Sequence, residues 1–248
     1  MKTGVQLSSL RPLLTSPDEV GYAFSVLAAM GCRDVQIQWI DPSVPVEFVA
    51  QALREYGLVS HGVQDYASAV MDNPSCYVEM NRLTGGTWLT LSRIPAALSP
   101  TAFARELRSL QRDLEGSGQL LSFHPVLSDY TSPDLSCPVE ELLRLMPDLS
   151  LCLDLYHLNR AGFSMPAWIR DHAGRISSVH FKDADASGLV PAGRGDTDWR
   201  QVVPACLSAG VSCAFVEQET WSGDPFRCLK EALDWLRNEC DAAEGSSP

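Results

Sequence analysis

The stretch Ile176-Ser177-Ser178-Val179-His180-Phe181-Lys182 is a short run rich in β-branched and aromatic residues, and a longer segment with helical periodicity, Trp199–Ala209, follows it. The same unit of strand, loop and amphipathic helix is repeated along the whole chain. Eight strands are predicted on this basis. Their ranges are Gly4–Ser8, Asp34–Trp39, Leu58–Gln64, Gly86–Leu91, Gln119–His124, Ser150–Asp154, Ile176–Lys182 and Val211–Glu217.

Helices with a clear apolar face are predicted between these strands. The clearest are Asp18–Met30, Val46–Tyr56, Pro100–Glu115, Val139–Met146, Trp199–Ala209 and Pro225–Asn238. Gly31, Gly57 and Gly210 follow predicted helices, where a left-handed residue satisfies the last carbonyls. Ser99-Pro100 and Asp198-Trp199 place a capping side chain before a first turn.

This alternation of eight strands with helices predicts a single-domain (β/α)8 TIM barrel, an α/β fold whose parallel strands are buried on both faces. We expect the barrel to span residues 1–241 and the tail 242–248 to be disordered. An open doubly wound sheet is the alternative. Such a sheet normally has a glycine-rich phosphate turn after its first strand, and the segment Ser8-Ser9-Leu10-Arg11-Pro12 is not such a turn.

Composition limits the partners. With 31 acidic against 19 basic residues, the formal net charge is −12, which disfavours nucleic acids and anionic membranes. No stretch resembles a signal peptide or a membrane span, so we expect a cytoplasmic protein. The eight cysteines include no CxxC pair and are expected to be reduced and mostly buried. A small-molecule substrate fits best, and assembly into a homo-oligomer stays open.

Polar residues end several of the predicted strands, and in a TIM barrel the chemistry lies at those carboxyl ends. Asp154 ends the sixth strand, His180 lies on the seventh and Glu217 on the eighth. Each residue alone also fits a simpler role, as a helix cap, a packed histidine or part of a solvated loop. Three such residues at one end of adjacent strands favour a site for a divalent ion, Mn or Mg first, with Co or Zn as alternatives.

Taken in order, four carboxyl-terminal segments are similar to motifs of the sugar phosphate isomerase/epimerase family of xylose isomerase-like barrels. They are 151–162, 179–183, 190–199 and 216–219. The resemblance extends to Gly4–Leu7 and Leu53–Leu58, so it covers nearly the whole chain. It is specific for the superfamily and weak for any one activity within it.

The resemblance implies a metal site made by a Glu after strand five, an Asp after strand six, a His on strand seven and a Glu on strand eight. Asp154, His180 and Glu217 occupy the last three positions. Asp129 stands where the first Glu is usual, with a side chain shorter by about 1.5 Å. Gln36 stands where relatives often carry Glu.

The activity implied is metal-dependent isomerisation or epimerisation of a sugar or sugar derivative, by proton transfer through a metal-stabilised enediolate. Glu217 is the expected catalytic base on one face, and Asp129 is its partner on the other, both also as metal ligands. Residues expected to contact substrate are His157, Lys182, His124, His61, Arg194 and Glu219. Lys182 in an ion pair, His124 and His61 in plain packing, and Arg194 against an acidic neighbour are the simpler interpretations.

Two other functions stay open. A lyase or dehydratase acting on a keto-inositol or keto-sugar would use the same metal and base. A barrel whose site has decayed to sugar binding is suggested by Gln36 and Asp129. A DNA-repair endonuclease of similar fold is disfavoured, because five histidines and an acidic balance do not suit a zinc cluster and a basic groove.

Overall fold

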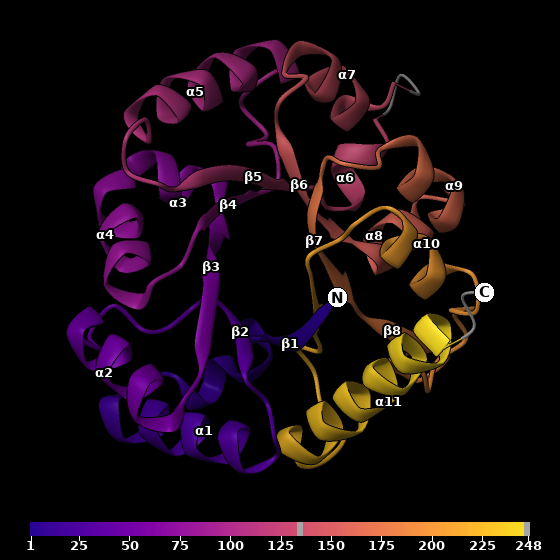
Figure 1. Ribbon diagram of the computed structural model, residues 1–248. Helices are drawn as coiled ribbons and strands as arrows, with labels where there is room; N and C mark the ends of the chain where they lie inside the picture. The colour runs from indigo at the N-terminus through magenta and orange to yellow at the C-terminus, as the bar shows by residue number, and fades with distance from the viewer. Residues whose placement is uncertain (133–135, 246–248) are drawn as a thin grey trace.

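A computed structural model describes residues 1–132 and 136–245. Eight strands form a closed barrel in the order β1-β10-β7-β6-β5-β4-β3-β2, and every neighbouring pair is parallel (Figure 1). The strands are β1 (Lys2–Gln6), β2 (Asp34–Ile37), β3 (Val59–Tyr66), β4 (Trp88–Ser92), β5 (Leu120–His124), β6 (Ser150–Asp154), β7 (Ile176–Phe181) and β10 (Cys213–Val216). The predicted (β/α)8 barrel is confirmed.

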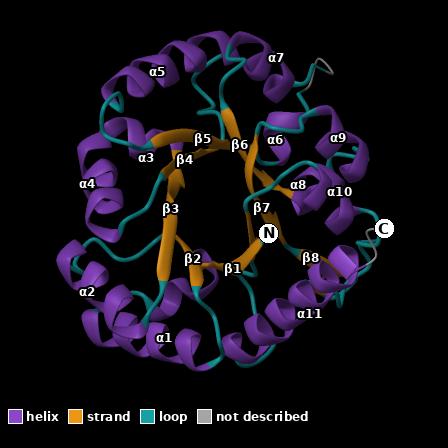
Figure 2. Ribbon diagram, viewed as in Figure 1, coloured by secondary structure: helices purple, strands orange, loops and turns teal. Residues whose placement is uncertain are grey.

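Helices form an outer ring around the strands (Figure 2). They are α1 (Pro17–Ala29), α2 (Val46–Tyr56), α3 (Ala67–Asp72), α4 (Pro74–Thr84), α5 (Pro100–Asp113), α6 (Leu127–Tyr130), α7 (Pro138–Leu145), α8 (Leu155–Arg160), α9 (Met165–Asp171), α10 (Val202–Ser208) and α11 (Pro225–Gly245). A 3-10 helix, η1 (Leu7–Leu13), follows β1, and an antiparallel hairpin of β8 (Asp183–Asp185) and β9 (Gly188–Val190) follows β7.

Helix α5 illustrates why the ring packs onto the barrel. Ser99 caps its start by accepting a hydrogen bond from the Ala102 backbone amide at 3.2 Å, as the sequence predicts. Phe103 and Leu107 lie four residues apart on its buried face, and the ring of Phe103 meets that of Phe123 on β5 at 5.6 Å between centroids. Burial of each such side chain contributes about 1.5–3 kcal/mol. The hydrophobic core therefore lies between the strands and the helices.

Several element boundaries differ from those predicted. The first strand ends at Gln6 rather than Ser8, because the chain turns there into η1. Helix α10 begins at Val202 rather than Trp199. The Trp199 indole instead donates a hydrogen bond to Asp183 Oδ2 at 2.9 Å, and Asp198 bonds with Arg200 instead of capping the helix.

The carboxyl-terminal helix is longer than predicted. Helix α11 continues past Asn238 to Gly245, so residues 242–245, expected to be disordered, are helical. Glu244 on this extension lies 3.6 Å from the amino group of Met1. The remaining residues of the expected tail, 246–248, lie outside the described part of the chain.

The barrel interior is unusually polar. Gln6, Gln36 and Gln64 are all buried there, and Gln6 Nε2 donates to Gln36 Oε1 at 2.9 Å.

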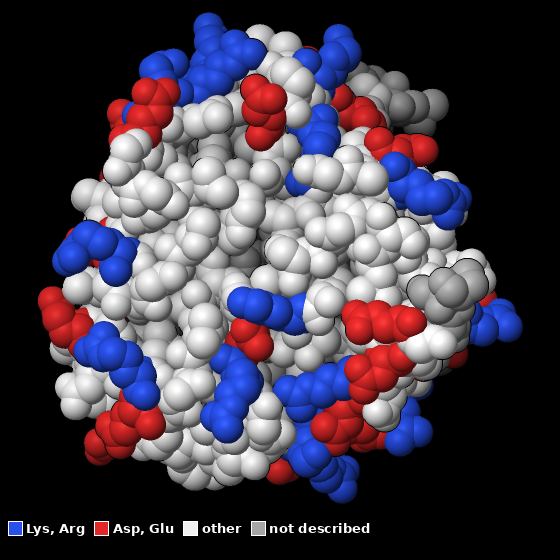
Figure 3. Space-filling model, in the orientation of Figure 1, with Lys and Arg blue, Asp and Glu red and all other residues white. Residues whose placement is uncertain are grey.

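All eight cysteines are free thiols, and most are buried. On the face seen in Figure 3, acidic and basic side chains alternate around the perimeter, and mostly uncharged side chains cover the centre. Among the described residues, no helix is both long and apolar enough to cross a bilayer.

Candidate functional site

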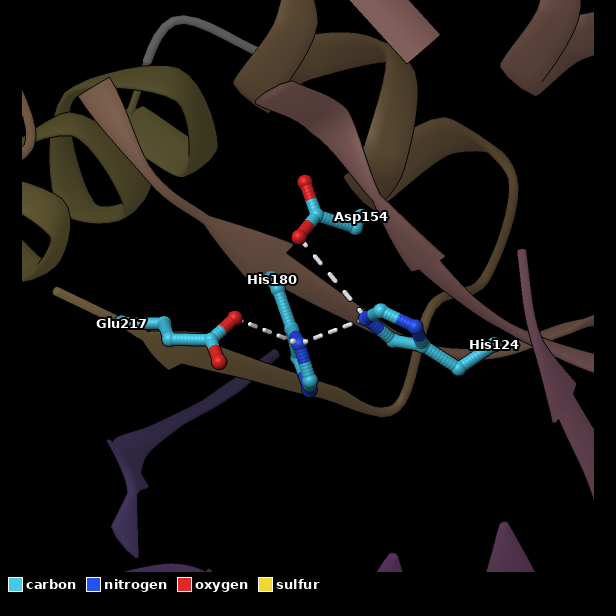
Figure 4. Close-up of side chains that lie close together, drawn as sticks. All are labelled: His124, Asp154, His180 and Glu217. Carbon is cyan, nitrogen blue, oxygen red and sulfur yellow. Dashed lines mark hydrogen bonds and ion pairs between the residues drawn. The ribbon is translucent and has the colours of Figure 1, made fainter. Parts of the chain in front are cut away.

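Four buried polar side chains converge at the carboxyl ends of neighbouring strands. His124 ends β5, Asp154 ends β6, His180 lies on β7 and Glu217 directly follows β10. Each offers a nitrogen or carboxylate oxygen, and these four atoms lie within 4.8 Å of one another. Figure 4 shows the two imidazoles side by side, with the carboxylates of Glu217 and Asp154 against them. Predicted strand positions thus place three of the four predicted metal ligands together, with His124 as the fourth member.

The two carboxylate oxygens of Asp154 have different surroundings. Its Oδ1 accepts a hydrogen bond from the His157 backbone amide at 3.0 Å and so caps helix α8. Its Oδ2 is buried and accepts no hydrogen bond, although His124 Nε2 lies 3.7 Å away. A buried carboxylate oxygen left without a hydrogen bond is costly unless a cation compensates it. Here the Lys182 ammonium, 3.4 Å away, supplies that charge, and a divalent ion could take the same position.

The orientation of the His180 ring follows from its contact with Gln36. His180 Nε2 lies 2.6 Å from Gln36 Oε1, a carbonyl oxygen that can only accept, so Nε2 carries the proton. The other nitrogen, Nδ1, faces His124 Nε2 at 3.2 Å and Glu217 Oε2 at 3.0 Å. Burial lowers the pKa of His180, but Cys152 and Glu217 outweigh it and raise that pKa well above its usual value. A proton and a metal ion therefore compete for Nδ1.

His124 is held in the complementary way. Its Nδ1 lies 3.2 Å from Ser92 Oγ, which leaves Nε2 facing the cluster. Burial, reinforced by the nearby His180, lowers the pKa of His124 to about 3, so this imidazole is neutral at ordinary pH. A neutral imidazole in this position is suited to binding a metal ion through Nε2.

Glu217 is anchored through one oxygen. Ser8 Oγ, at the start of η1, donates a hydrogen bond to Glu217 Oε1 at 2.8 Å. Burial raises the pKa of this carboxyl, but Lys182 and His180 outweigh burial and hold it well below its usual value. Glu217 is therefore an ionised carboxylate whose second oxygen points into the cluster.

Lys182 contributes the positive charge beside these carboxylates. Its Nζ lies 3.4 Å from Asp154 Oδ2, 3.2 Å from Glu217 Oε2 and 2.9 Å from Glu219 Oε1. Burial lowers the pKa of Lys182, but the three carboxylates raise it well above its usual value, so the group stays an ammonium. Burial and the charge of Glu217 raise the pKa of Glu219. Lys182 is therefore both a member of a buried ion-pair network and a residue that lines the pocket.

These donors fit a divalent ion. Two imidazole nitrogens and two carboxylate oxygens are buried within 4.8 Å of one another. Imidazoles suit Zn, Co, Fe and Mn better than Mg, which prefers an all-oxygen shell. The Lys182 ammonium shares the same carboxylates, so an ion bound here would compete with it for Asp154 and Glu217.

The structure does not bring Asp129 to this cluster. Asp129 lies on the short helix α6, where its Oδ1 accepts from the Ile94 amide at 3.1 Å and its Oδ2 from the Val126 amide at 2.8 Å. Burial raises the pKa of this carboxyl to about 6, against the opposing effect of the two amides. Both oxygens of Asp129 thus accept hydrogen bonds from backbone amides. His124 occupies the position in the cluster that was expected for Asp129.

Other predicted contact residues fall into two groups. His157, Lys182 and Glu219 line the same depression as Glu217. His61 lies near the opposite end of the barrel, 2.6 Å from Asp34 Oδ1, at the start of β2. Arg194 is exposed and pairs with Glu231 on α11.

The glycines around Arg194 have a structural reason. The backbone amides of Gly193 and Gly195 both donate to Asp183 Oδ2, at 3.1 and 3.0 Å. A Cβ on Gly195 would lie 2.3 Å from Asp183 Oδ1. This loop is therefore a tight turn held by Asp183.

Sequence reasoning singled out Gln36 only as a departure from the resembled pattern, and it missed the other residues that orient the cluster and line its mouth. Ser8, Gln36 and Ser92 position Glu217, His180 and His124, and Trp39, Tyr66 and Arg93 line the depression. A polar residue facing inward from a barrel strand was the available signal for Gln36. Trp39 and Arg93 each follow a strand, at the end where barrel chemistry lies.

Neither a family model nor a curated protein sequence matches the chain. Solved structures do. A sugar phosphate isomerase/epimerase from Parabacteroides distasonis superposes with a TM-score of 0.80 at 14% identity, over 96% of this chain and 98% of that one. An L-ribulose 3-epimerase has a TM-score of 0.78 at 15% identity, over 99% and 96%.

The chain therefore shares the TIM-barrel fold of these proteins. A D-allulose 3-epimerase from Methylomonas sp., solved in complex with D-allulose, also superposes, with a TM-score of 0.76 at 14% identity over 96% of this chain and 97% of that one. The predicted resemblance to sugar phosphate isomerase/epimerase barrels is confirmed along nearly the whole chain, at identities that establish shared architecture.

Proposed function

We propose that this protein is a divalent-metal-dependent isomerase or epimerase of a sugar or sugar derivative. The observation that carries the proposal is the buried cluster of His124, Asp154, His180 and Glu217 at the carboxyl ends of the barrel strands. Four polar side chains from neighbouring strands are buried together here, and a divalent ion would balance their carboxylates as the Lys182 ammonium does. Similar barrels that are named sugar epimerases and isomerases support the same reaction class.

His124 Nε2, His180 Nδ1, Asp154 Oδ2 and Glu217 Oε2 would hold the ion. When bound, a divalent ion supplies Lewis acidity to the carbonyl and hydroxyl oxygens of a ketose, which makes the adjacent C–H proton more acidic. Because the donor set contains two imidazoles, we expect Mn, Co or Zn to be preferred to Mg.

Glu217 is the proposed base. Its carboxylate is ionised because Lys182 and His180 lower its pKa, and Ser8 fixes its direction through Oε1. A positioned base of this kind contributes about 10²–10⁴-fold to a proton transfer. Glu217 would take the proton from the carbon next to the carbonyl.

Lys182 and Glu219 complete the proton-transfer group. The Lys182 ammonium would donate a hydrogen bond to a substrate oxygen on which negative charge develops. Burial and the charge of Glu217 raise the pKa of Glu219, which makes this carboxylate easier to protonate and suits it to proton transfer. It replaces Asp129 as the second acid–base residue, because both Asp129 oxygens accept backbone hydrogen bonds.

The test is hydrogen exchange in deuterated water. Metal-loaded protein is incubated with a panel of ketoses, and incorporation of deuterium next to the carbonyl is followed by NMR. We expect exchange without loss of water, and a fall of about 10²–10⁴-fold in Glu217→Gln. Glu106→Gln, an exposed residue on α5, is the matched control and should exchange like the native protein.

The other outcomes decide between the alternatives. An unsaturated product would show a dehydratase on the same scaffold. Absence of exchange with every ketose, by protein that has taken up metal, would contradict the proposal and favour a sugar-binding barrel.

A further inference from the structure

Two arginines and two aromatic residues form a continuous stack along one wall of the pocket mouth. Arg11 Cζ lies 4.8 Å from the ring centre of Trp39, the rings of Trp39 and Tyr66 are 5.7 Å apart, and Arg93 Cζ lies 5.3 Å from the ring centre of Tyr66. Contacts of this length are cation–π interactions. We call these four residues the arginine stack.

The arginine stack belongs to the same depression as the candidate site. Trp39, Tyr66 and Arg93 line it together with Lys182 and Glu217. Arg11 lies on η1, the element whose Ser8 holds Glu217, and covers the Trp39 ring. Three of the four stack residues therefore lie in the wall of the depression that holds Glu217, and Arg11 lies behind Trp39.

Two members of the stack have strained backbones. Trp39 (φ 57°) and Arg93 (φ 64°) are the non-glycine residues with positive φ in the described ranges. Such strain persists only where surrounding contacts fix it, and it concentrates at ligand sites. The Arg93 amide donates to the His124 carbonyl at 3.1 Å, and the next amide, of Ile94, donates to Asp129 Oδ1. Asp129 therefore helps to position Arg93 at the mouth.

Neither guanidinium in the stack has a carboxylate partner. Like most arginines in the described parts of the chain, Arg11 and Arg93 lie within 4.0 Å of no carboxylate, and what distinguishes them is the aromatic ring that each guanidinium covers. Both are exposed, and aromatic rings limit their freedom. A planar guanidinium that is pre-oriented and unpaired is suited to bind carboxylate or phosphate through two hydrogen bonds.

The charges in the pocket also favour a ligand with a carboxylate or phosphate group. Asp154, Glu217 and Glu219 carry three negative charges against the positive charges of Lys182 and Arg93, so a divalent ion in the cluster would give the pocket a net charge of about +1. A positive pocket favours a substrate with negative charge.

We propose that the substrate is a sugar with an anionic group, a phosphate or a carboxylate, held by Arg93 and Arg11 while its reacting carbons lie at Glu217. This inference rests on the proposed function for the position of the reacting carbons. The carbon chain would lie against Trp39 and Tyr66.

The first experiment measures binding of three ketoses that differ only at carbon six: D-fructose, D-fructose 6-phosphate and D-fructuronate. Titration calorimetry on metal-loaded protein should give at least about tenfold tighter binding for one of the anionic ketoses than for D-fructose. Whether the phosphate or the carboxylate binds more tightly identifies the group. Equal or tighter binding of D-fructose would overturn the proposal.

Variants assign the effect to the stack. Arg93→Gln and, independently, Arg11→Gln should weaken binding of the preferred anionic ketose about tenfold and that of D-fructose less than twofold. Arg105→Gln, an exposed position on α5, makes the same charge change away from the mouth and should alter neither. Equal weakening of all three ketoses, or an Arg105→Gln effect as large as that of Arg93→Gln, would contradict the proposal.

Inorganic phosphate separates this inference from the proposed function. Its binding to chelator-treated protein needs no catalysis, and Arg93→Gln should weaken it. Failure of both inorganic phosphate and acetate to bind, or binding that both stack variants leave unchanged, would overturn the anion subsite even if neutral ketoses exchange deuterium. Phosphate binding that depends on Arg93, in a protein that exchanges no ketose, would leave the subsite standing and remove the proposed reaction.

Discussion

His180 Nε2 donates a hydrogen bond to Gln36 Oε1 at 2.6 Å, across the interior of the barrel. This bond fixes the tautomer of the imidazole and turns Nδ1 toward His124 and Glu217. The residue that departs from the resembled pattern on the second strand is thus the one that orients a candidate ligand. The uncharged side chain of Gln36 orients His180 without adding a further negative charge to a pocket that already holds three carboxylates.

Replacing Gln36 tests that relationship. Gln36→Leu removes the acceptor and should weaken Mn²⁺ binding about 10–100-fold, because the groups that orient ligating histidines typically contribute that much. Gln36→Glu keeps an acceptor oxygen and should bind Mn²⁺ at least as well as the native protein. Calorimetric titration of both variants measures the difference. Native affinity in Gln36→Leu would show that the bond does not orient the ring for metal.

His124 should set the choice of metal. With an imidazole at this position we expect tighter binding of Zn²⁺ and Co²⁺ than of Mg²⁺. His124→Glu adds an oxygen donor and should narrow the ratio of Zn²⁺ to Mg²⁺ affinity at least about tenfold. Competition against a metal-sensitive dye measures both affinities. An unchanged ratio would exclude His124 from the coordination shell.

The His61–Asp34 pair predicts a pH dependence of stability away from the candidate site. Burial lowers the pKa of His61, but hydrogen bonds to Asp34 and Cys213 outweigh it and raise that pKa from 6.5 to about 9. A raised pKa stabilises the fold fully below the unfolded value of 6.5, and this stability is lost as pH rises through 9. The contribution is on the order of 2 kcal/mol, since the side chain is only 15% exposed.

Asp34→Asn isolates that contribution. Urea unfolding at about pH 6 and about pH 9.5 should show a smaller loss of unfolding free energy in the variant than in the native protein. Identical losses in the two proteins would assign the pH dependence to other groups.

Asp129 separates the role predicted from sequence from the role seen in the structure. Asp129→Ala leaves the Ile94 and Val126 amides without their acceptor, so the free energy of unfolding should fall by about 1–3 kcal/mol. Mn²⁺ affinity should change less than about threefold, because Asp129 lies outside the cluster. A large loss of Mn²⁺ affinity with unchanged stability would restore Asp129 as a ligand.

Repetition of local pattern made the fold predictable. Every strand of the barrel overlaps a predicted strand, because buried parallel strands show as short apolar runs. The predicted boundaries were wrong where a long-range hydrogen bond competed with local preference. Trp199 donates a hydrogen bond to Asp183 instead of starting α10, and Ser8 leaves the line of β1 and donates to Glu217. Such bonds join residues far apart in the chain and leave no local signal.

The site was predictable where a residue ends a strand. Asp154, His180 and Glu217 lie where alternation and strand order place them. Asp129 follows β5 by a few residues, and a linear alignment cannot show that a short helix turns its carboxylate toward backbone amides. His124 ends the strand itself, and strand position proved the better guide to the cluster than motif spacing.

Metal stoichiometry tests the central claim most directly. Chelator-treated native protein, dialysed to equilibrium against Mn²⁺, should retain one ion per chain, and the Asp154→Ala/His180→Ala double variant should retain none while circular dichroism shows an intact fold. Native protein that retains no ion, or a double variant that retains as much as the native chain, would contradict a divalent metal centre at this end of the barrel.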